Sequence, residues 1–264
     1  MDKENDIKKY IKWILIGVIA IVLYIVIALS VNNSSKATSD DYLLVGNKLI
    51  WNKIDGVWYQ VTEVNDDLLK HKYTLDDGQN TYQIADIQYS DLQWYFFDEN
   101  YKEISSDGFR VAYSGDLKIK TADYNEEKYD ESDDDVISAV VSDISVSQLN
   151  IMRASLLKYS VDLDNDGQNE VIYTFSDNKL DVLDYIPTSY LVLVKNGEVL
   201  DQIKTTGSST MYVVQEILDL DNDGAYELVV SSDVIDNPTF VSCYQIYKIV
   251  SGKIKLVQQC LYEN

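Results

Sequence analysis

The stretch VDLDNDGQNEVIY, residues 161–173, returns as LDLDNDGAYELVV at residues 218–230, and this repeat decides the fold. Each copy places carboxylates at positions 1, 3, 5 and 9 of a loop and then continues as an apolar run. Four like charges in nine residues repel one another unless something positive lies among them. A short apolar run after turn residues is typical of a buried strand. The repeat therefore predicts two acidic loops, each leading into a strand.

The spacing of the loop carboxylates favours a hard cation. Oxygens at positions 1, 3 and 5 converge when a chain wraps Ca²⁺, glycine at position 6 allows the sharp turn, and the backbone carbonyl of position 7 adds an oxygen. Mg²⁺ suits the loops less because it prefers a tight octahedron and its own waters. We therefore expect two Ca²⁺ sites, one per loop, with each loop ordered by its ion. The predicted ligands are Asp162, Asp164, Asp166, Gln168 and Glu170, and Asp219, Asp221, Asp223, Ala225 and Glu227.

The loops differ from EF-hand and dockerin loops. Those need an acid at position 12, where this chain has Tyr173 or Val230, and a helix after the loop. The pattern DLDNDGxxE followed by a strand resembles the calcium loops of FG-GAP and VCBS-type repeats, the family that includes the integrin α-chain propeller. The resemblance covers about residues 149–264 and is closest to anchored ectodomains of Gram-positive bacteria. It implies a partial β-propeller-like domain, because two loops are too few for a closed ring.

Each repeat continues in the same order. A strand (residues 170–175 or 227–231) leads to a variable loop and then to a hairpin that turns at Asn196-Gly197 or at Ser251-Gly252. A unit of this size matches a propeller blade. The predicted fold class is therefore mainly β, with a short helix ahead of the repeats.

The N-terminus predicts a membrane anchor. Residues 13–31, from Trp13 to Val31, carry no charge and are long enough to cross a bilayer as a helix. Three lysines flank the N-terminal side, so residues 1–12 are expected in the cytoplasm and the bulk of the chain outside the cell. A cleaved signal peptide is the alternative, although its apolar region is usually shorter.

The rest of the chain is divided by composition. Residues 32–41 form a polar tether, residues 42–122 an aromatic-rich β domain, residues 123–135 an acidic linker and residues 136–264 the calcium-loop repeat domain. A short amphipathic helix is expected to begin near residue 136. The aromatic residues of 42–122 either pack across strands in the core, which is the usual role, or line a glycan-binding face.

Charge and missing motifs limit the function. A net charge of −22 argues against nucleic acid as a partner and favours cations and basic partners. No nucleophile elbow, phosphate loop or dinucleotide fingerprint occurs. We therefore expect a binding or interaction module at the cell surface with an unknown protein or glycan ligand. The alternative is an accessory enzyme acting on cell wall or glycan, with Trp51, Trp58 and Trp94 on its binding face.

The two cysteines are expected to form a disulfide. In a two-residue hairpin at Ser251-Gly252, opposed residue numbers add up to 503, and Cys243 and Cys260 satisfy this rule. The same register places Tyr247, Ile249, Ile254 and Leu256 on one buried face, and Lys248 opposite Lys255. Two separate buried thiols are the alternative.

Overall fold

The computed structural model describes residues 41–259, except 65, 76–79, 91–92, 105–108, 143, 178–186, 207–210 and 237–238, and gives only the backbone for 233–242. The predicted cytoplasmic tail and membrane segment, and the tether apart from Asp41, lie outside these residues. Within them, no helix has both the length and the apolar character needed to cross a membrane.

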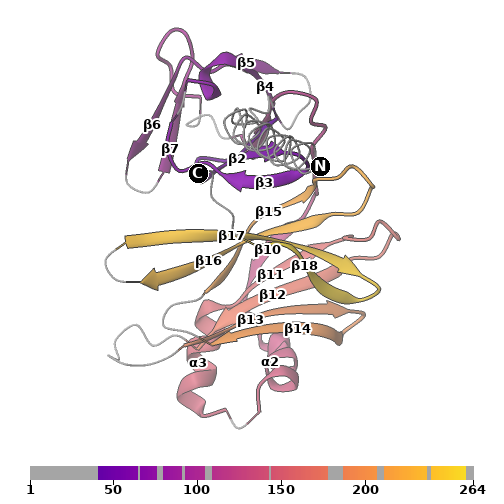
Figure 1. Ribbon diagram of the computed structural model, residues 1–264. Helices are drawn as coiled ribbons and strands as arrows, with labels where there is room; N and C mark the ends of the chain where they lie inside the picture. The colour runs from indigo at the N-terminus through magenta and orange to yellow at the C-terminus, as the bar shows by residue number, and fades with distance from the viewer. Residues whose placement is uncertain are drawn as a thin grey trace, which may run out of the picture. The chain divides into compact units, whose positions relative to one another are not determined.

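Residues 40–264 form one compact unit in which the described strands build antiparallel sheets, as expected for a mainly β chain (Figure 1). The first sheet has six strands in the order β3-β2-β1-β8-β4-β5 and is called the N-terminal sheet below. Its strands are β1 (Tyr42–Val45), β2 (Leu49–Ile54), β3 (Val57–Gln60), β4 (Lys72–Leu75), β5 (Thr81–Gln83) and β8 (Val111–Tyr113). The strands β6 (Asp86–Ser90) and β7 (Gln93–Phe97) form a separate pair, and η1 (Leu68–Lys70) is a single helical turn.

The two repeats form two five-stranded sheets of matching topology. The first repeat sheet has the order β10-β11-β12-β13-β14 and the second has β9-β15-β16-β17-β18. The first is made of β10 (Asn125–Lys128), β11 (Leu157–Val161), β12 (Glu170–Ser176), β13 (Thr188–Lys195) and β14 (Glu198–Thr206). The second is made of β9 (Lys120–Thr121), β15 (Tyr212–Asp219), β16 (Glu227–Asp236), β17 (Thr239–Val250) and β18 (Lys253–Gln258). The predicted order of loop, strand and hairpin is confirmed in both copies.

The hairpin turns have the geometry that their residues predict. Asn196 and Gly197 have φ angles of 54° and 79°, and Ser251 and Gly252 have 53° and 69°. Positive φ at both central residues defines a type I′ turn, whose twist matches that of the flanking strands. The two turns therefore set the pairing of the residues next to them, and the register shifts farther along, between Leu193 and Val194 in the first hairpin and between Ile246 and Tyr247 in the second.

The sheets are stacked in layers. The two repeat sheets pack face to face, with Ile172 and Leu193 of one against Ile217 and Val230 of the other in a single apolar cluster. Helices cover the outer face of the first repeat sheet, and the N-terminal sheet covers the outer face of the second (Figure 1). The central strands of the repeat sheets are thus buried on two faces. This explains why β13 reads as a nearly unbroken apolar run instead of alternating.

The tryptophans of the N-terminal region belong to the core. Trp51, Trp58 and Trp94 are 2%, 4% and 5% exposed. Trp51 and Trp58 pack in one cluster with Val229 and Ile246 of the second repeat sheet. The core reading of these aromatics is confirmed, and the suggestion that the three tryptophans line a ligand-binding face is wrong.

Residues 123–135, predicted as a linker, contain regular structure. β10 lies in this part of the chain and is an edge strand of the first repeat sheet, and β9, which comes just before it, is an edge strand of the second. The acidic residues that follow form η3 (Glu131–Asp133) and the start of α2 (Asp134–Val140), which is the expected amphipathic helix. Its acidic first turn suits the positive end of a helix. The regions predicted as separate domains share the apolar cluster that contains Trp51 and Val229.

A second helix, α3 (Val146–Ser155), was not predicted. Ser145 caps it by accepting a hydrogen bond from Gln148 N–H, and the Gln148 side chain accepts one from Ser145 N–H. This reciprocal pair is a capping box, and the sequence S-x-x-Q was the signal for it. Met152 is the buried residue of α3 and packs toward the first repeat sheet.

The register of the last hairpin departs from the predicted rule. Tyr247 pairs with Leu256 as expected, but Ile246 pairs with Gln258, because Val257 is an extra residue in β18. Tyr247, Ile249 and Ile254 are buried, whereas Leu256 is 43% exposed, so the prediction of its burial is wrong. Beyond the bulge, the rule that placed Cys260 opposite Cys243 no longer applies. Cys260 itself lies outside the described residues.

Candidate metal centre

The two acidic loops occupy equivalent positions, between β11 and β12 and between β15 and β16. Their backbones match in detail. Asn165 and Asn222, at position 4, have φ angles of 57° and 61°, and the glycines at position 6, Gly167 and Gly224, have 85° and 91°. The repeated sequence therefore produces the same loop conformation twice.

The aspartates at position 1 hold the glycine turn. Asp162 Oδ2 accepts a hydrogen bond from Gly167 N–H at 2.9 Å, and Asp219 Oδ2 accepts one from Gly224 N–H at 3.2 Å. Asp219 is 1% exposed, and its Oδ1 is buried without a hydrogen-bond partner among the described residues. Lys120 Nζ lies 3.9 Å from the other oxygen, Oδ2, so Asp219 already has one distant positive partner. The buried Oδ1 remains without a donor in the described part of the chain, and an unsatisfied carboxylate oxygen is costly.

The glutamates at position 9 tie each loop to its strand. Glu170 Oε2 accepts a hydrogen bond from Leu163 N–H at 2.9 Å, and Glu227 Oε2 accepts one from Leu220 N–H at 2.8 Å. Both glutamates are at most 2% exposed. Burial raises the pKa of Glu227, and the hydrogen bonds from Lys248 and Leu220 N–H oppose that rise.

The structure brings part of the predicted ligand set together. In each loop the carboxylates at positions 1, 3 and 9 place an oxygen within 4.8 Å of one another: Asp162, Asp164 and Glu170, and Asp219, Asp221 and Glu227. In each loop, the aspartate at position 5 accepts a hydrogen bond from the backbone N–H of the residue at position 7. Gln168 N–H donates to Asp166 Oδ1 at 2.9 Å, and Ala225 N–H donates to Asp223 Oδ1 at 3.0 Å.

A lysine from the neighbouring strand enters each loop, and the sequence analysis missed both. Lys195 Nζ lies 2.5 Å from Glu170 Oε1, 2.8 Å from Asp166 Oδ2 and 3.6 Å from Asp164 Oδ2. Lys248 Nζ lies 2.7 Å from Glu227 Oε1, 2.7 Å from Asp223 Oδ2 and 2.9 Å from Asp221 Oδ2. Each ammonium group thus contacts the carboxylates at positions 3, 5 and 9.

The carboxylates keep both ammonium groups charged. Hydrogen bonds with Asp166 and Glu170 raise the pKa of Lys195 above its ordinary value. Burial alone would lower the pKa of Lys248, but hydrogen bonds with Asp223, Glu227 and Asp221 raise it. In return, Lys195 lowers the pKa of Asp166.

Strand pairing is the signal that could have revealed the lysines. Glu170 pairs directly with Lys195, and Glu227 pairs directly with Lys248. Oppositely charged side chains at paired positions attract each other on the same face of a sheet. Lys248 also pairs with Lys255, as predicted, and the nearby loop carboxylates explain how that like-charged pair is tolerated.

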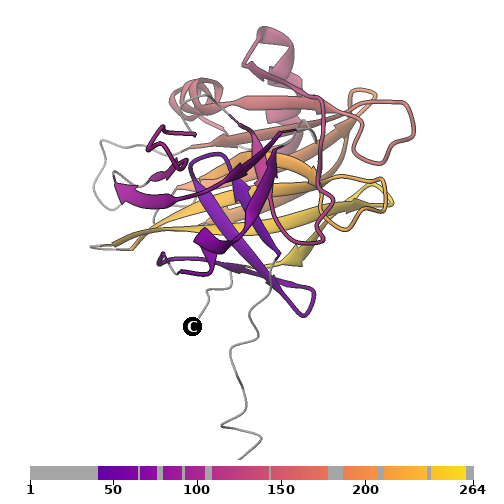
Figure 2. The same cartoon turned by 90° about the horizontal axis from the view of Figure 1, so that it is seen from above.

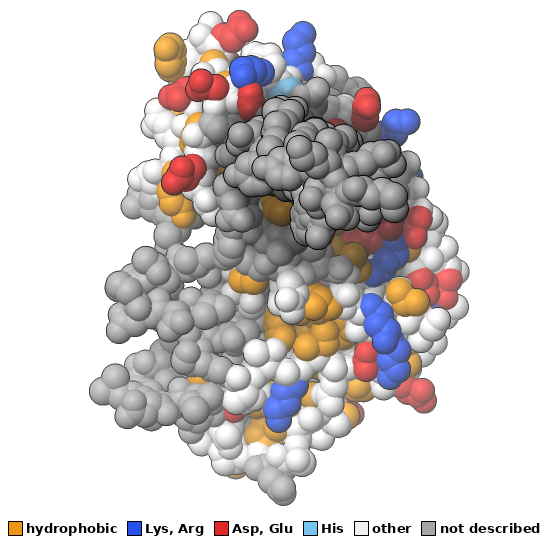
Figure 3. Space-filling view, viewed as in Figure 1, with side chains coloured by type: hydrophobic (Ala, Val, Ile, Leu, Met, Phe, Trp, Pro, Cys, Tyr) orange, Lys and Arg blue, Asp and Glu red, His pale blue; other side chains and the backbone are white. Residues whose placement is uncertain are grey.

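The two loops contact each other at one edge of the repeat sheets. Tyr226 N–H, in the second loop, donates a hydrogen bond of 2.8 Å to Leu163 O in the first. Figures 1 and 2 show both loops on the same side, at the right of each view. Acidic and basic side chains lie next to one another along that side in the space-filling view (Figure 3). The edge therefore carries mixed charge.

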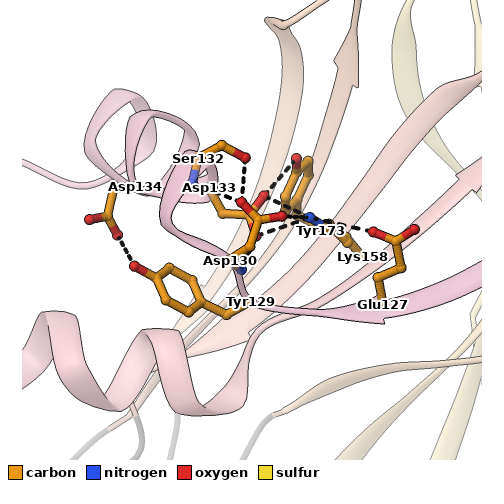
Figure 4. A network of polar contacts seen from close by, with 8 residues as sticks. All are labelled: Glu127, Tyr129, Asp130, Ser132, Asp133, Asp134, Lys158 and Tyr173. Carbon is orange, nitrogen blue, oxygen red and sulfur yellow. Dashed lines mark hydrogen bonds and ion pairs between the residues drawn. The ribbon is translucent and has the colours of Figure 1, made fainter.

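A second polar cluster lies around Lys158 and has a structural role (Figure 4). Lys158 Nζ lies 2.5 Å from Asp130 Oδ2 and 3.3 Å from Asp133 Oδ2, and Tyr173 Oη donates to Asp133 Oδ1 at 3.2 Å. Asp133 is 1% exposed and is satisfied by these groups and by Asp130 N–H. These contacts fasten η3 to β11 and β12, and they leave no carboxylate of the cluster in need of a ligand.

Comparisons with protein-family models, with curated proteins and with solved structures found no match to this chain.

Proposed function

We propose that the protein is a calcium-stabilised interaction module, anchored in the cell membrane by residues 13–31 and displayed outside the cell. In this proposal the two repeats are similar to propeller blades of the FG-GAP and VCBS type, and each acidic loop binds one Ca²⁺. The partner is a protein or glycan outside the cell, and the acidic surface favours a basic one.

One observation carries the proposal. The same three loop positions bring carboxylate oxygens within 4.8 Å of one another in both repeats, so the arrangement is built twice by the fold. Oxygens at this spacing suit Ca²⁺, which accepts six to eight oxygens in loose geometry. The buried Oδ1 of Asp219 adds support, because a bound cation would satisfy it.

Calcium titration of the full chain in mild detergent tests the proposal. Sites of this class in extracellular modules have dissociation constants on the order of 10⁻⁴–10⁻³ M. At a hundred times that constant, each site stabilises the fold by about 2.7 kcal/mol. For a unit of this size, such a gain raises Tm by roughly 5–10 °C. We expect this rise with calcium and its reversal by chelator.

Matched variants locate the binding. Asp164→Asn and Asp221→Asn each remove one position-3 carboxylate, and each is expected to abolish one of two binding events in calorimetry. Asp135→Asn makes the same change of charge at an exposed residue outside the loops and should leave both events intact. Absence of binding heat together with an unchanged Tm in calcium would refute the calcium function.

A further inference from the structure

We infer that Lys195 and Lys248 are tethered cations that compete with Ca²⁺ for the acidic loops, so that each loop alternates between a lysine-filled and a calcium-filled state. This inference rests on the proposed calcium function and concerns the regulation of the same two sites.

The ammonium groups and the proposed ion share ligands. The oxygens that converge in each loop come from positions 1, 3 and 9, and the lysine contacts positions 3, 5 and 9. Positions 3 and 9 belong to both sets: Asp164 and Glu170 in the first loop, Asp221 and Glu227 in the second. A Ca²⁺ ion sits about 2.3–2.6 Å from its oxygens. An ammonium group that lies 2.5 Å or 2.7 Å from the same buried glutamate, and 3.6 Å or 2.9 Å from the same position-3 aspartate, leaves too little separation for two cations.

The same arrangement of lysine and carboxylates occurs in both repeats. The two lysines come from β13 and β17, the equivalent strands of the two repeats, and each pairs with the position-9 glutamate of its own loop. Their side chains are 17% and 16% exposed, which is low for lysine, and each has three donors facing three carboxylates. A surface lysine that happened to fold over an acidic patch would not reproduce these partners twice.

The lysines therefore lower the affinity of the loops for calcium and keep the loops folded when no ion is bound. An ammonium group removes part of the carboxylate repulsion, so the loops keep their conformation when calcium is scarce. Calcium must then displace a formed ion pair, which weakens its binding compared with an empty loop. Displacement frees two lysines at the edge where the loops meet, and calcium thereby changes the charges presented there.

The test compares the calcium affinity of the wild-type full chain with that of Lys195→Met and Lys248→Met. Methionine keeps an unbranched apolar stem of similar length and removes the charge. We expect each variant to bind calcium roughly tenfold more tightly at its own loop, the factor that corresponds to losing one part-buried ion pair. Lys255→Met is the matched control, because Lys255 is exposed, carries the same charge and pairs with Lys248 without a contact to the loop carboxylates. Its affinity should change far less.

A second measurement follows the ammonium groups directly. In ¹⁵N-labelled protein, ion pairing is expected to slow proton exchange of the Lys195 and Lys248 ammonium groups enough for their NMR signals to be seen. The loss of one signal in each variant assigns it. Calcium should remove both signals from the wild-type protein. Affinities of both lysine variants equal to wild type would overturn the inference while the calcium function stands. Calcium binding by the variants but not by wild type would support the inference and remove the calcium function of the native chain. Failure of all three proteins to bind calcium would overturn both.

Discussion

Gly224 shows how the loop conformation depends on one residue. Its φ of +91° is a backbone conformation that L side chains rarely adopt, and a Cβ added there would meet no atom within 4 Å. The cost of Gly224→Ala is therefore purely conformational, and we expect the free energy of unfolding to fall by about 1 kcal/mol. Urea denaturation measures it. Gly224→Asn should cost less, because asparagine tolerates positive φ better than alanine, and equal stability of the alanine variant and wild type would contradict the argument.

Asp130 links the fold to pH through the cluster in Figure 4. The hydrogen bond with Lys158 lowers the pKa of Asp130 from 3.8 to about 2. A folded-state pKa below the unfolded one means that the carboxylate stabilises the fold above pH 3.8, and that this contribution is lost as the pH falls toward 2. We expect the stability of wild type to decline more steeply over this range than that of Asp130→Asn. Thermal melts at steps of pH measure it, and parallel curves for the two proteins would show that Asp130 makes no such contribution.

At the scale of single elements, the N-terminus of α3 is held by one side chain. Ser145 Oγ accepts the hydrogen bond of Gln148 N–H, which has no partner within the helix. Ser145→Ala is expected to lower the free energy of unfolding by about 1 kcal/mol. Ser145→Asp keeps an acceptor at this position and should restore most of the loss. The same loss in both variants would show that packing, and not the cap, is what Ser145 provides.

Elements with local causes could be predicted from the sequence. The strands after the acidic loops and the type I′ turns at Asn196-Gly197 and Ser251-Gly252 follow from neighbouring residues, and all are present. The bulge at Val257 could not be predicted, because the turn fixes register only until an extra residue intervenes. The edge strands β9 and β10 were missed for a related reason. The sequence of β10 is acidic and exposed, and β9 consists only of Lys120 and Thr121. Both form strands because the repeat sheets offer free edges to pair with.

The candidate site also has a part that could be predicted from the sequence and a part that could not. Its carboxylates lie within nine residues of one another, so their spacing alone indicates a cation-binding loop. Along the chain, Lys195 lies 25 residues after Glu170 and Lys248 lies 21 residues after Glu227, and strand pairing brings each lysine to its glutamate. A pattern search within one loop cannot find a partner supplied by another strand.

At the scale of the whole compact unit, layers of sheet depend on a few polar contacts as well as on apolar packing. Arg110, next to β8, forms two hydrogen bonds with Glu216 of β15, at 3.1 Å and 2.6 Å. It also donates to Ala122 O at 3.0 Å and lies over the ring of Tyr124. Glu216 is 4% exposed, and besides Arg110 its carboxylate accepts a hydrogen bond of 2.9 Å from Ile217 N–H, so the guanidinium group supplies the positive charge that its burial requires. The pair connects the N-terminal sheet to the second repeat sheet.

Removing Arg110 should therefore weaken the joint between these layers. Breaking a buried ion pair by deleting one partner costs about 3–5 kcal/mol. The side chain of Arg110 is 38% exposed, so solvent screens part of the effect, and we expect Arg110→Met to lower the free energy of unfolding by about 2 kcal/mol. Arg153→Met is the control. It breaks an Arg–Asp pair whose partners are both about one-third exposed, so solvent screens it more and it should cost less than Arg110→Met.

A second substitution separates the buried charge from the lost packing. Glu216→Gln in the Arg110→Met background removes the uncompensated carboxylate, and we expect it to recover at least half of the lost stability. Chemical denaturation of the four proteins in this cycle gives the coupling between the two residues directly. A coupling near zero would mean that apolar packing around Trp51 and Val229 joins the layers without help from the ion pair. A large coupling would show that the ion pair holds the N-terminal sheet against the second repeat sheet, and high salt should then weaken this contact before it disturbs the packing between the two repeats.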